Sequence, residues 1–171
     1  MLRPIVLYGA EVLAKPSKPV TNISDGEIQL VKDMVETMYK APGVGLAAPQ
    51  VGVGKRIMVT DPSAGEKQNQ LITIFNPEIA SSEGEQLEEE GCLSIPGFSA
   101  VVLRPRKVIV KGLDVNSKEI AVEGKDLLAR AFCHEMDHLN GVFFLDHLSF
   151  LKRDLIKRKI RKLAKQGEWE P

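Results

Sequence analysis

The chain has 171 residues, 43% of them hydrophobic, and its 23 lysines and arginines balance its 23 aspartates and glutamates. A zero net charge gives no reason to expect a nucleic-acid partner, and no apolar run approaches the ~20 residues of a membrane span. The first residues lack the features of a signal or transit peptide. We therefore expect one domain over residues 1–171, located in the cytoplasm, with no membrane partner and no specific nucleic-acid partner.

The first predicted helix covers about residues 25–40. Ser24 and Glu27 have the spacing of a capping box, apolar residues recur behind them at helical intervals, and Pro42-Gly43 ends the pattern. The following stretch, GVGLAAPQVG, is too rich in glycine and proline for a regular element. Runs of β-branched residues then predict strands at 56–60, 71–80 and 107–115.

Two further helices are predicted in the last third of the chain. One covers about residues 124–140 and stops at Gly141. The other covers about 149–166, with lysines outward and with these apolar positions inward: Leu151, Leu155, Ile156, Ile160 and Leu163. Helices at both ends with strands between them indicate an α+β fold, with short antiparallel strands packed around the helix over residues 124–140.

Two segments carry a strong local charge. Residues 83–90, EGEQLEEE, are acidic, and residues 152–165 contain eight lysines or arginines and a single acid, Asp154. Runs of this kind usually form solvated surfaces, and we interpret both in that way first.

The central helix contains the stretch FCHEMDHLNG at 132–141. His134 and His138 are four residues apart, so both can bind one divalent metal ion from the same helix face. Glu135 is rotated about 100° from His134, where a carboxylate can act on a metal-bound water without binding the metal. The alternative is a pair of histidines satisfied in the core, which would leave Glu135 buried without a purpose.

A catalytic metal site needs a third ligand and an open position. Cys133 points away from the two histidines and is interpreted as a small core residue, and no downstream acid is well placed. Cys92, in EGCLSIPG, is expected on a tight turn at the start of a strand, where its thiolate would complete the site. By ligand type alone, one thiolate and two imidazoles favour zinc.

Three stretches together resemble the signature motifs of the peptide deformylase family: GVGLAAPQ at 43–50, EGCLS at 90–94 and HEMDH at 134–138. They occur in the order and at the separations typical of that family. The resemblance implies one catalytic domain over residues 1–171 that removes the N-formyl group from the formyl-methionine of newly synthesised polypeptides, by a metal-bound hydroxide. It implies Fe(II), with Ni, Co or Zn able to substitute.

The resemblance also implies residue roles. The metal ligands are Cys92, His134 and His138, and Glu135 is the general acid and base. Oxyanion stabilisation is assigned to the side-chain amide of Gln50 and the backbone N–H of Leu93, and Gly45 is counted with these catalytic positions. The substrate main chain is expected at Val44, Gly45 and Gly97, and the methionine pocket at Leu127, Ala131 and the aliphatic stem of Arg130.

Glu90, Arg104 and Asp137 are either partners that orient the ligands or ordinary surface ion pairs. The basic helix at 149–166 suggests weak, salt-dependent association with ribosomes. Two other functions share part of the motif: a metallopeptidase that cuts internal peptide bonds, and a structural metal site closed by a fourth ligand.

Overall fold

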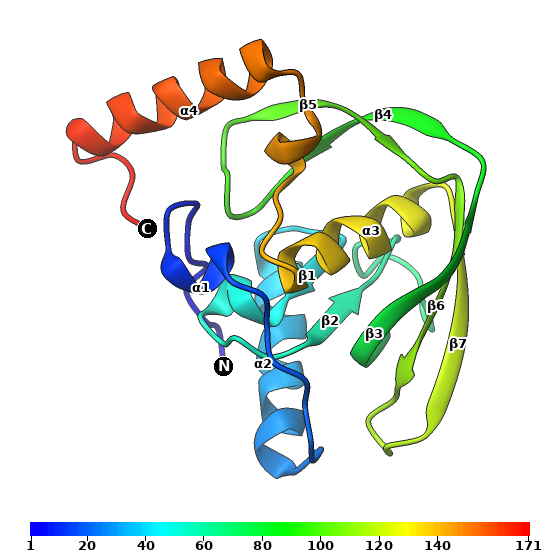
Figure 1. Cartoon of the computed structure of the whole chain (residues 1–171). Coiled ribbons are helices and arrows are strands. Elements are labelled where there is room, and N and C mark those ends of the chain that lie inside the picture. The colour runs from blue at the N-terminus through cyan, green and yellow to red at the C-terminus, as the bar shows by residue number, and fades with distance from the viewer.

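A computed structural model describes residues 1–171 and has the predicted α+β architecture (Figure 1). One antiparallel sheet has the strand order β1-β2-β3-β6-β7, and β4 and β5 form a separate antiparallel pair. The strands are β1 (Gly45–Ala47), β2 (Ile57–Thr60), β3 (Ile72–Glu83), β4 (Gln86–Gly91), β5 (Ser99–Arg104), β6 (Lys107–Leu113) and β7 (Glu119–Lys125). The helices are α1 (Glu11–Ala14), α2 (Asp25–Lys40), α3 (Leu127–Leu139) and α4 (Phe150–Lys165), with 3-10 turns at Ala48–Val51 and Phe144–His147.

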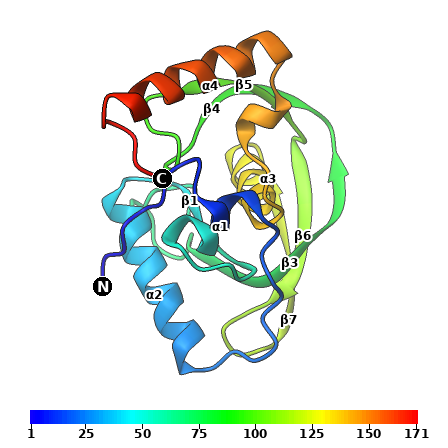
Figure 2. The same cartoon turned by 60° about the vertical axis from the view of Figure 1, so that its left-hand side comes forward.

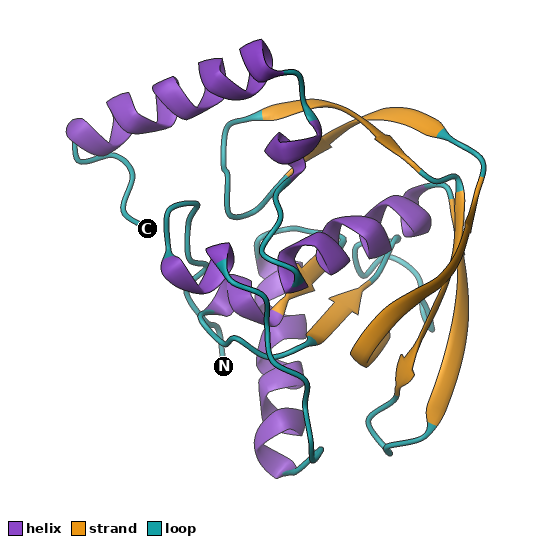
Figure 3. Cartoon of the chain, in the orientation of Figure 1, coloured by secondary structure: helices purple, strands orange, loops and turns teal.

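Helix α3 lies in the middle of the molecule, where it contacts strands of both sheets (Figure 3). Every residue from 129 to 136 is buried, so the helix is covered on all sides rather than along one stripe. A helix enclosed in this way holds its side chains in fixed rotamers, which suits it to carry a site.

The end of α3 is the one predicted. Gly141 has a φ of +75°, and the N–H of Val142 donates to the carbonyl of Asp137 at 2.8 Å, as in a Schellman motif. The start is later than predicted, because residues 119–125 form strand β7. Gly124 belongs to that strand, and a Cβ there would come within 2.8 Å of the Phe132 ring. This glycine therefore lets β7 approach α3 closely.

The predicted helix at 25–40 is confirmed as α2, and the Glu27 carboxylate accepts the backbone N–H of Ser24 at 3.0 Å. The three predicted strands are confirmed with small changes in their ends. The stretch GVGLAAPQVG, however, is partly regular, because Gly45–Ala47 pairs with β2. The acidic run at 83–90 is also only partly solvated, since Gln86 and Glu90 in β4 point inward and are buried.

Helix α4 packs through only part of the face that was predicted. Ile160 is buried, and Ile156 and Leu163 pack with it against the cluster that contains Phe144 and Trp169. Leu151 and Leu155 are 79% and 55% exposed, because the period of 3.6 residues places them on the opposite side of the helix from Ile160. No helix of the structure is long and apolar enough to cross a membrane.

Candidate active site

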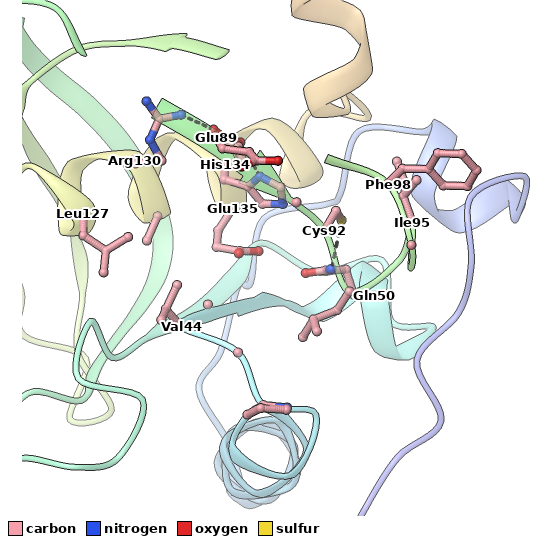
Figure 4. Close-up of a pocket in the computed structure, with 18 residues that line it drawn as sticks. Val44, Gln50, Glu89, Cys92, Ile95, Phe98, Leu127, Arg130, His134 and Glu135 are labelled. Carbon is pink, nitrogen blue, oxygen red and sulfur yellow. Dashed lines mark hydrogen bonds and ion pairs between the residues drawn. The ribbon is translucent and has the colours of Figure 1, made fainter. Parts of the chain in front are cut away.

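A cavity of about 460 Å³ opens beside α3, between strand β1 and the loop that joins β4 to β5 (Figure 4). It is lined by every residue predicted for the site except His138, which is buried beneath its wall. These lining residues are Val44, Gly45, Gln50, Cys92, Leu93, Gly97, Leu127, Ala131, His134 and Glu135. The fold therefore brings together three segments that are far apart in the sequence.

Three potential metal-binding atoms converge at this cavity. The donor atoms of Cys92, His134 and His138 all lie within 4.8 Å of one another. The Nε2 atom of His138 is 3.2 Å from Cys92 Sγ and 3.2 Å from His134 Nε2. Burial, together with the neighbouring His134, lowers the pKa of His138 well below its usual value, which favours the neutral ring that metal binding needs.

This donor set fits a divalent metal ion. The Nδ1 atom of His134 lies 2.5 Å from a carboxylate oxygen of Glu90, which directs Nε2 toward Cys92 and His138. Nitrogen and sulfur atoms that face one another in a buried place are favourable when a cation lies between them. One thiolate and two imidazoles are ligands that zinc, iron, nickel and cobalt all accept.

Cys92 does not lie where the sequence suggested. It directly follows the last residue of β4, so it stands at the end of a strand, and residues 93–97 form turns rather than a strand. The N–H of Ile95 donates to the carbonyl of Cys92 at 3.0 Å and closes the first of these turns. Cys133 is a core residue, as predicted, and burial raises the pKa of its thiol to about 11.

A buried network of charges lies behind His134. Glu90 accepts hydrogen bonds from Arg104 at 2.6 Å and from Arg130 at 2.6 Å, and Arg104 also donates to Asp137 at 2.7 Å. Although burial opposes its ionisation, hydrogen bonds from His134 and Arg104 lower the pKa of Glu90 well below its usual value. Glu90 and Arg104 are thus an internal pair that contacts a candidate ligand, rather than a surface ion pair.

Glu135 points from α3 toward strand β1 (Figure 4). Its side chain is buried, and Oε2 has no hydrogen-bond partner in the protein. Burial raises the pKa of this carboxyl to about 7, which suits a group that takes up and releases a proton near neutral pH. Gly45 makes room for it, since a Cβ at that position would lie 2.5 Å from Glu135 Oε1.

Two hydrogen-bond donors face the same space. The Gln50 side-chain oxygen accepts the Ala47 N–H at 2.9 Å, which turns the amide nitrogen toward Ser94 Oγ at 3.2 Å and Cys92 Sγ at 3.8 Å. The backbone N–H of Leu93 donates to no acceptor within the protein. The Leu93 N–H, together with the Gln50 N–H that reaches Cys92 only at 3.8 Å, is therefore available to an oxygen atom that enters the cavity beside Cys92.

The residues predicted to bind substrate lie along both sides of the cavity. Val44 and Gly45 stand at β1, the edge strand of the large sheet, and Gly97 lies opposite in the β4–β5 loop. Leu127 is at the mouth and Ala131 is deeper on α3. The Arg130 guanidinium turns away toward Glu90 and the carbonyl of Val102, so its stem is the part that lines the cavity.

Sequence reasoning missed Glu89, Ile95 and Phe98, which also line the cavity. All three belong to the β4–β5 hairpin, and neither strand of that hairpin was predicted. The run SAVVLR at 99–104 is rich in β-branched and other apolar residues and was the available signal for β5.

Comparisons with known proteins agree with one another. The family model described as polypeptide deformylase matches residues 2–154. A peptide deformylase of Acidobacterium capsulatum is 48% identical over 169 residues, which is 99% of this chain and 99% of that protein.

Solved structures give the same result. A peptide deformylase from Legionella pneumophila has a TM-score of 0.90 and 45% identity, with 100% of each chain covered. A peptide deformylase from Ehrlichia chaffeensis, in complex with actinonin, has a TM-score of 0.86 and 38% identity, with 94% of this chain and 96% of that chain covered.

Proposed function

Since the chain belongs to the polypeptide deformylase family, we propose that it hydrolyses the N-formyl group from the N-terminal formyl-methionine of newly synthesised polypeptides, and that residues 1–171 act as one catalytic domain. One observation carries this proposal. The buried carboxylate of Glu135 shares a cavity with the donor atoms of Cys92 and His134, above His138. This is the arrangement that metal-dependent hydrolysis of an amide requires.

Cys92, His134 and His138 would hold the metal. A divalent ion there would lower the pKa of a water molecule and polarise the formyl carbonyl. We propose Fe(II) as the physiological metal, on the resemblance to the family, with Ni, Co or Zn able to replace it because the ligands accept all four. Glu90 orients His134 through its contact with Nδ1.

Glu135 moves the proton. Its Oε2 has no partner in the protein and is free to take a proton from the attacking water. The same carboxyl then delivers the proton to the nitrogen of the departing methionine. A pKa of about 7, raised by burial, allows both directions of transfer at neutral pH.

Gln50 and Leu93 stabilise the negative charge on the formyl oxygen. The Gln50 amide nitrogen lies 3.8 Å from Cys92 Sγ, and the backbone N–H of Leu93, the next residue, has no acceptor in the protein. Each donor of this kind is commonly worth about 2.7–4 kcal/mol in the transition state. Gly45 contributes by leaving space for Glu135 beside the substrate backbone.

The substrate lies in the cavity as an extended strand. Strand β1 has a free edge that can pair with a peptide main chain at Val44 and Gly45, and Gly97 lies on the opposite side. Leu127, Ala131 and the stem of Arg130 form the apolar surface for the methionine side chain. Pairing through the main chain does not discriminate between the side chains that follow methionine in the substrate. This suits an enzyme that acts on most new polypeptides. We also propose that this cavity binds actinonin, as a structural relative does.

The test is turnover of formyl-Met-Ala-Ser by protein purified without air, with the metal content measured on the same sample. Release of formate, with no reaction of acetyl-Met-Ala-Ser and no cleavage of internal peptide bonds, is expected. Glu135→Gln should keep the metal and lose activity, which separates an active hydrolase from a structural metal site. Cleavage within the peptide would instead indicate a metallopeptidase.

We place the activity in the cytoplasm, where translation supplies the substrate. The exposed basic face of α4 supports weak, salt-dependent association with the phosphate-rich ribosome.

A further inference from the structure

The loop of residues 92–98, here called the wall loop, forms one side of the cavity and contains Cys92, Leu93, Gly97 and Phe98. It joins β4 to β5 and has no regular secondary structure. Its middle is held by the carbonyl of Ser94, which accepts the backbone N–H of Tyr8 at 2.9 Å. The far end of the loop, at Gly97 and Phe98, makes no backbone hydrogen bond before Ser99 pairs with Gly91 in the ladder, so side-chain packing contributes to its position.

That packing comes from the segment of residues 168–171. Trp169 is only 5% exposed, and its indole N–H donates to the carbonyl of Tyr8 at 2.8 Å. Its ring meets the Phe98 ring edge to face, with centroids 6.3 Å apart. Ile95 of the wall loop belongs to the same apolar cluster. Figures 1 and 2 show the end of the chain beside α1 and the segment that leads into it.

The sequence directs Trp169 to this place through the end of α4. Gly167 has a φ of +74°, and the N–H of Glu168 donates to the carbonyl of Leu163 at 2.9 Å, which is a Schellman motif. This motif turns the chain back toward the wall loop. The family model matches only residues 2–154, so the whole segment lies beyond the part that the chain shares with that model.

We propose that Trp169 is a positioning residue, which holds Phe98 and thereby fixes the Gly97 side of the cavity against the bound peptide. Trp169 does not touch the substrate and acts only through the wall loop. This inference rests on the proposed function, because Gly97 is assigned to the peptide main chain. It follows that Trp169 affects the binding of substrates that extend beyond methionine and leaves the chemical step unchanged.

The first experiment compares kcat and KM of the wild-type protein and Trp169→Ala. For formyl-Met-Ala-Ser we expect KM to rise about 3- to 10-fold, the factor that corresponds to the loss of one aromatic pair, with kcat and metal content unchanged. For formyl-methionine amide, which lacks the later residues, KM should not change. Trp169→Phe keeps an aromatic ring against Phe98 and should have a KM close to that of the wild-type protein. Glu170→Ala, at an exposed neighbouring position, serves as the control.

Phe98→Ala tests the route of the effect. If Trp169 acts through Phe98, the double variant should show the same KM as Phe98→Ala alone. Additive effects would contradict the proposal. An unchanged KM in Trp169→Ala together with a lower unfolding temperature would also overturn it, because Trp169 would then only stabilise the fold.

Two measurements do not depend on turnover. Amide hydrogen exchange should increase in residues 92–98 of Trp169→Ala and not in the Glu170→Ala control, and equal exchange in both would refute the proposal. Trp169 is also the only tryptophan of the chain, so its emission should change when the product Met-Ala-Ser or actinonin fills the cavity. Absence of formate release by the wild-type protein would count against the proposed function, whereas the exchange measurement judges the role of Trp169 separately.

Discussion

At the scale of single residues, the candidate site depends on the lack of a side chain at Gly45 as much as on the side chains that line the cavity. Glu135 occupies space that a β-carbon at position 45 would fill, and its Oε2 remains without a protein partner. The sequence identified Gly45 through a motif, but the physical reason became visible only when β1 and α3 were placed together.

We predict that Gly45→Ala displaces the Glu135 carboxyl and lowers kcat for formyl-Met-Ala-Ser by about 10²-fold, the usual cost of moving a catalytic group by about 1 Å. Metal content should be unchanged, because no ligand contacts position 45. Gly54→Ala is the control, since a Cβ there meets nothing closer than Val12 at 3.9 Å. A normal kcat in Gly45→Ala would show that Glu135 tolerates the shift or has another role.

At the scale of elements, α3 needs its last turn to be held, because His138 lies there. Arg56 does this from the start of β2: its guanidinium donates to the carbonyl of Leu139 at 2.8 Å and to Asn140 Oδ1 at 3.0 Å. The first of these bonds goes to a carbonyl that the helix itself leaves unpaired, which also accepts the N–H of Ser17 at 2.8 Å, and it places a positive charge at the negative end of the helix.

We predict that Arg56→Met lowers the free energy of unfolding by about 1.5–3 kcal/mol, the range for hydrogen bonds to a charged group, and weakens metal binding. Urea denaturation and metal competition with a chelator measure the two effects. Lys32→Met removes an exposed charge that forms no ion pair and should change neither. If the two variants behave alike, Arg56 does not stabilise the end of α3.

The start of α2 gives a prediction about pH. Hydrogen bonds from Lys55 and from Ser24 lower the pKa of Glu27 to about 2. Because the folded pKa is below the unfolded value of about 4.3, the contribution to stability is complete above that value and is lost as the pH falls toward 2.

Glu27→Gln should therefore have a lower unfolding temperature than the wild-type protein at pH 6, and the difference should shrink between about pH 4.5 and pH 2. Glu85→Gln, at an exposed position without an ion pair, should show no such difference. If the difference in unfolding temperature between the wild-type protein and Glu27→Gln stays constant with pH, the ionisation of Glu27 is not the cause of that difference.

Helix α2 was predicted well because its helical period is set by one buried face. Strands β2, β3 and β6 were predicted from their runs of β-branched residues instead, and β2 is buried at all four positions. Leu151 and Leu155 of α4 were wrongly assigned to the inward face, since apolar spacing does not say which of two apolar stripes meets the protein; only the packing of Ile160 decides. The partners of His134 could be named from the sequence, but whether Glu90 is internal depends on the unpredicted β4–β5 hairpin.

At the scale of the whole molecule, residues from opposite ends of the chain close the back of the cavity. Leu13, Phe144, Ile160 and Trp169 share one buried cluster with Ile95 of the wall loop. Removing residues 150–171 to test ribosome association would therefore also expose this cluster and loosen the wall loop. With such a truncation, a loss of ribosome binding caused by unfolding could not be distinguished from one caused by removal of the basic surface.

Charge neutralisation avoids that confusion, because glutamine keeps the helix propensity of lysine. The first variant replaces three exposed lysines of α4 by glutamine: Lys152, Lys159 and Lys162. The control replaces three exposed lysines elsewhere on the surface: Lys32, Lys67 and Lys118. Both variants lose the same net charge, and substitutions of this kind usually change stability by less than about 0.5 kcal/mol.

We predict that the α4 variant loses co-sedimentation with ribosomes at low salt, whereas the control variant keeps it. The dependence of binding on salt should also become weaker, since each lost phosphate contact lowers the slope of log K against log salt by about 0.7–0.9. Deformylation of a free peptide should be equal in both variants, because the lysines lie outside the cavity. Equal retention by the two variants would mean that attraction depends on net charge alone and that α4 is simply a solvated surface, as the sequence first suggested.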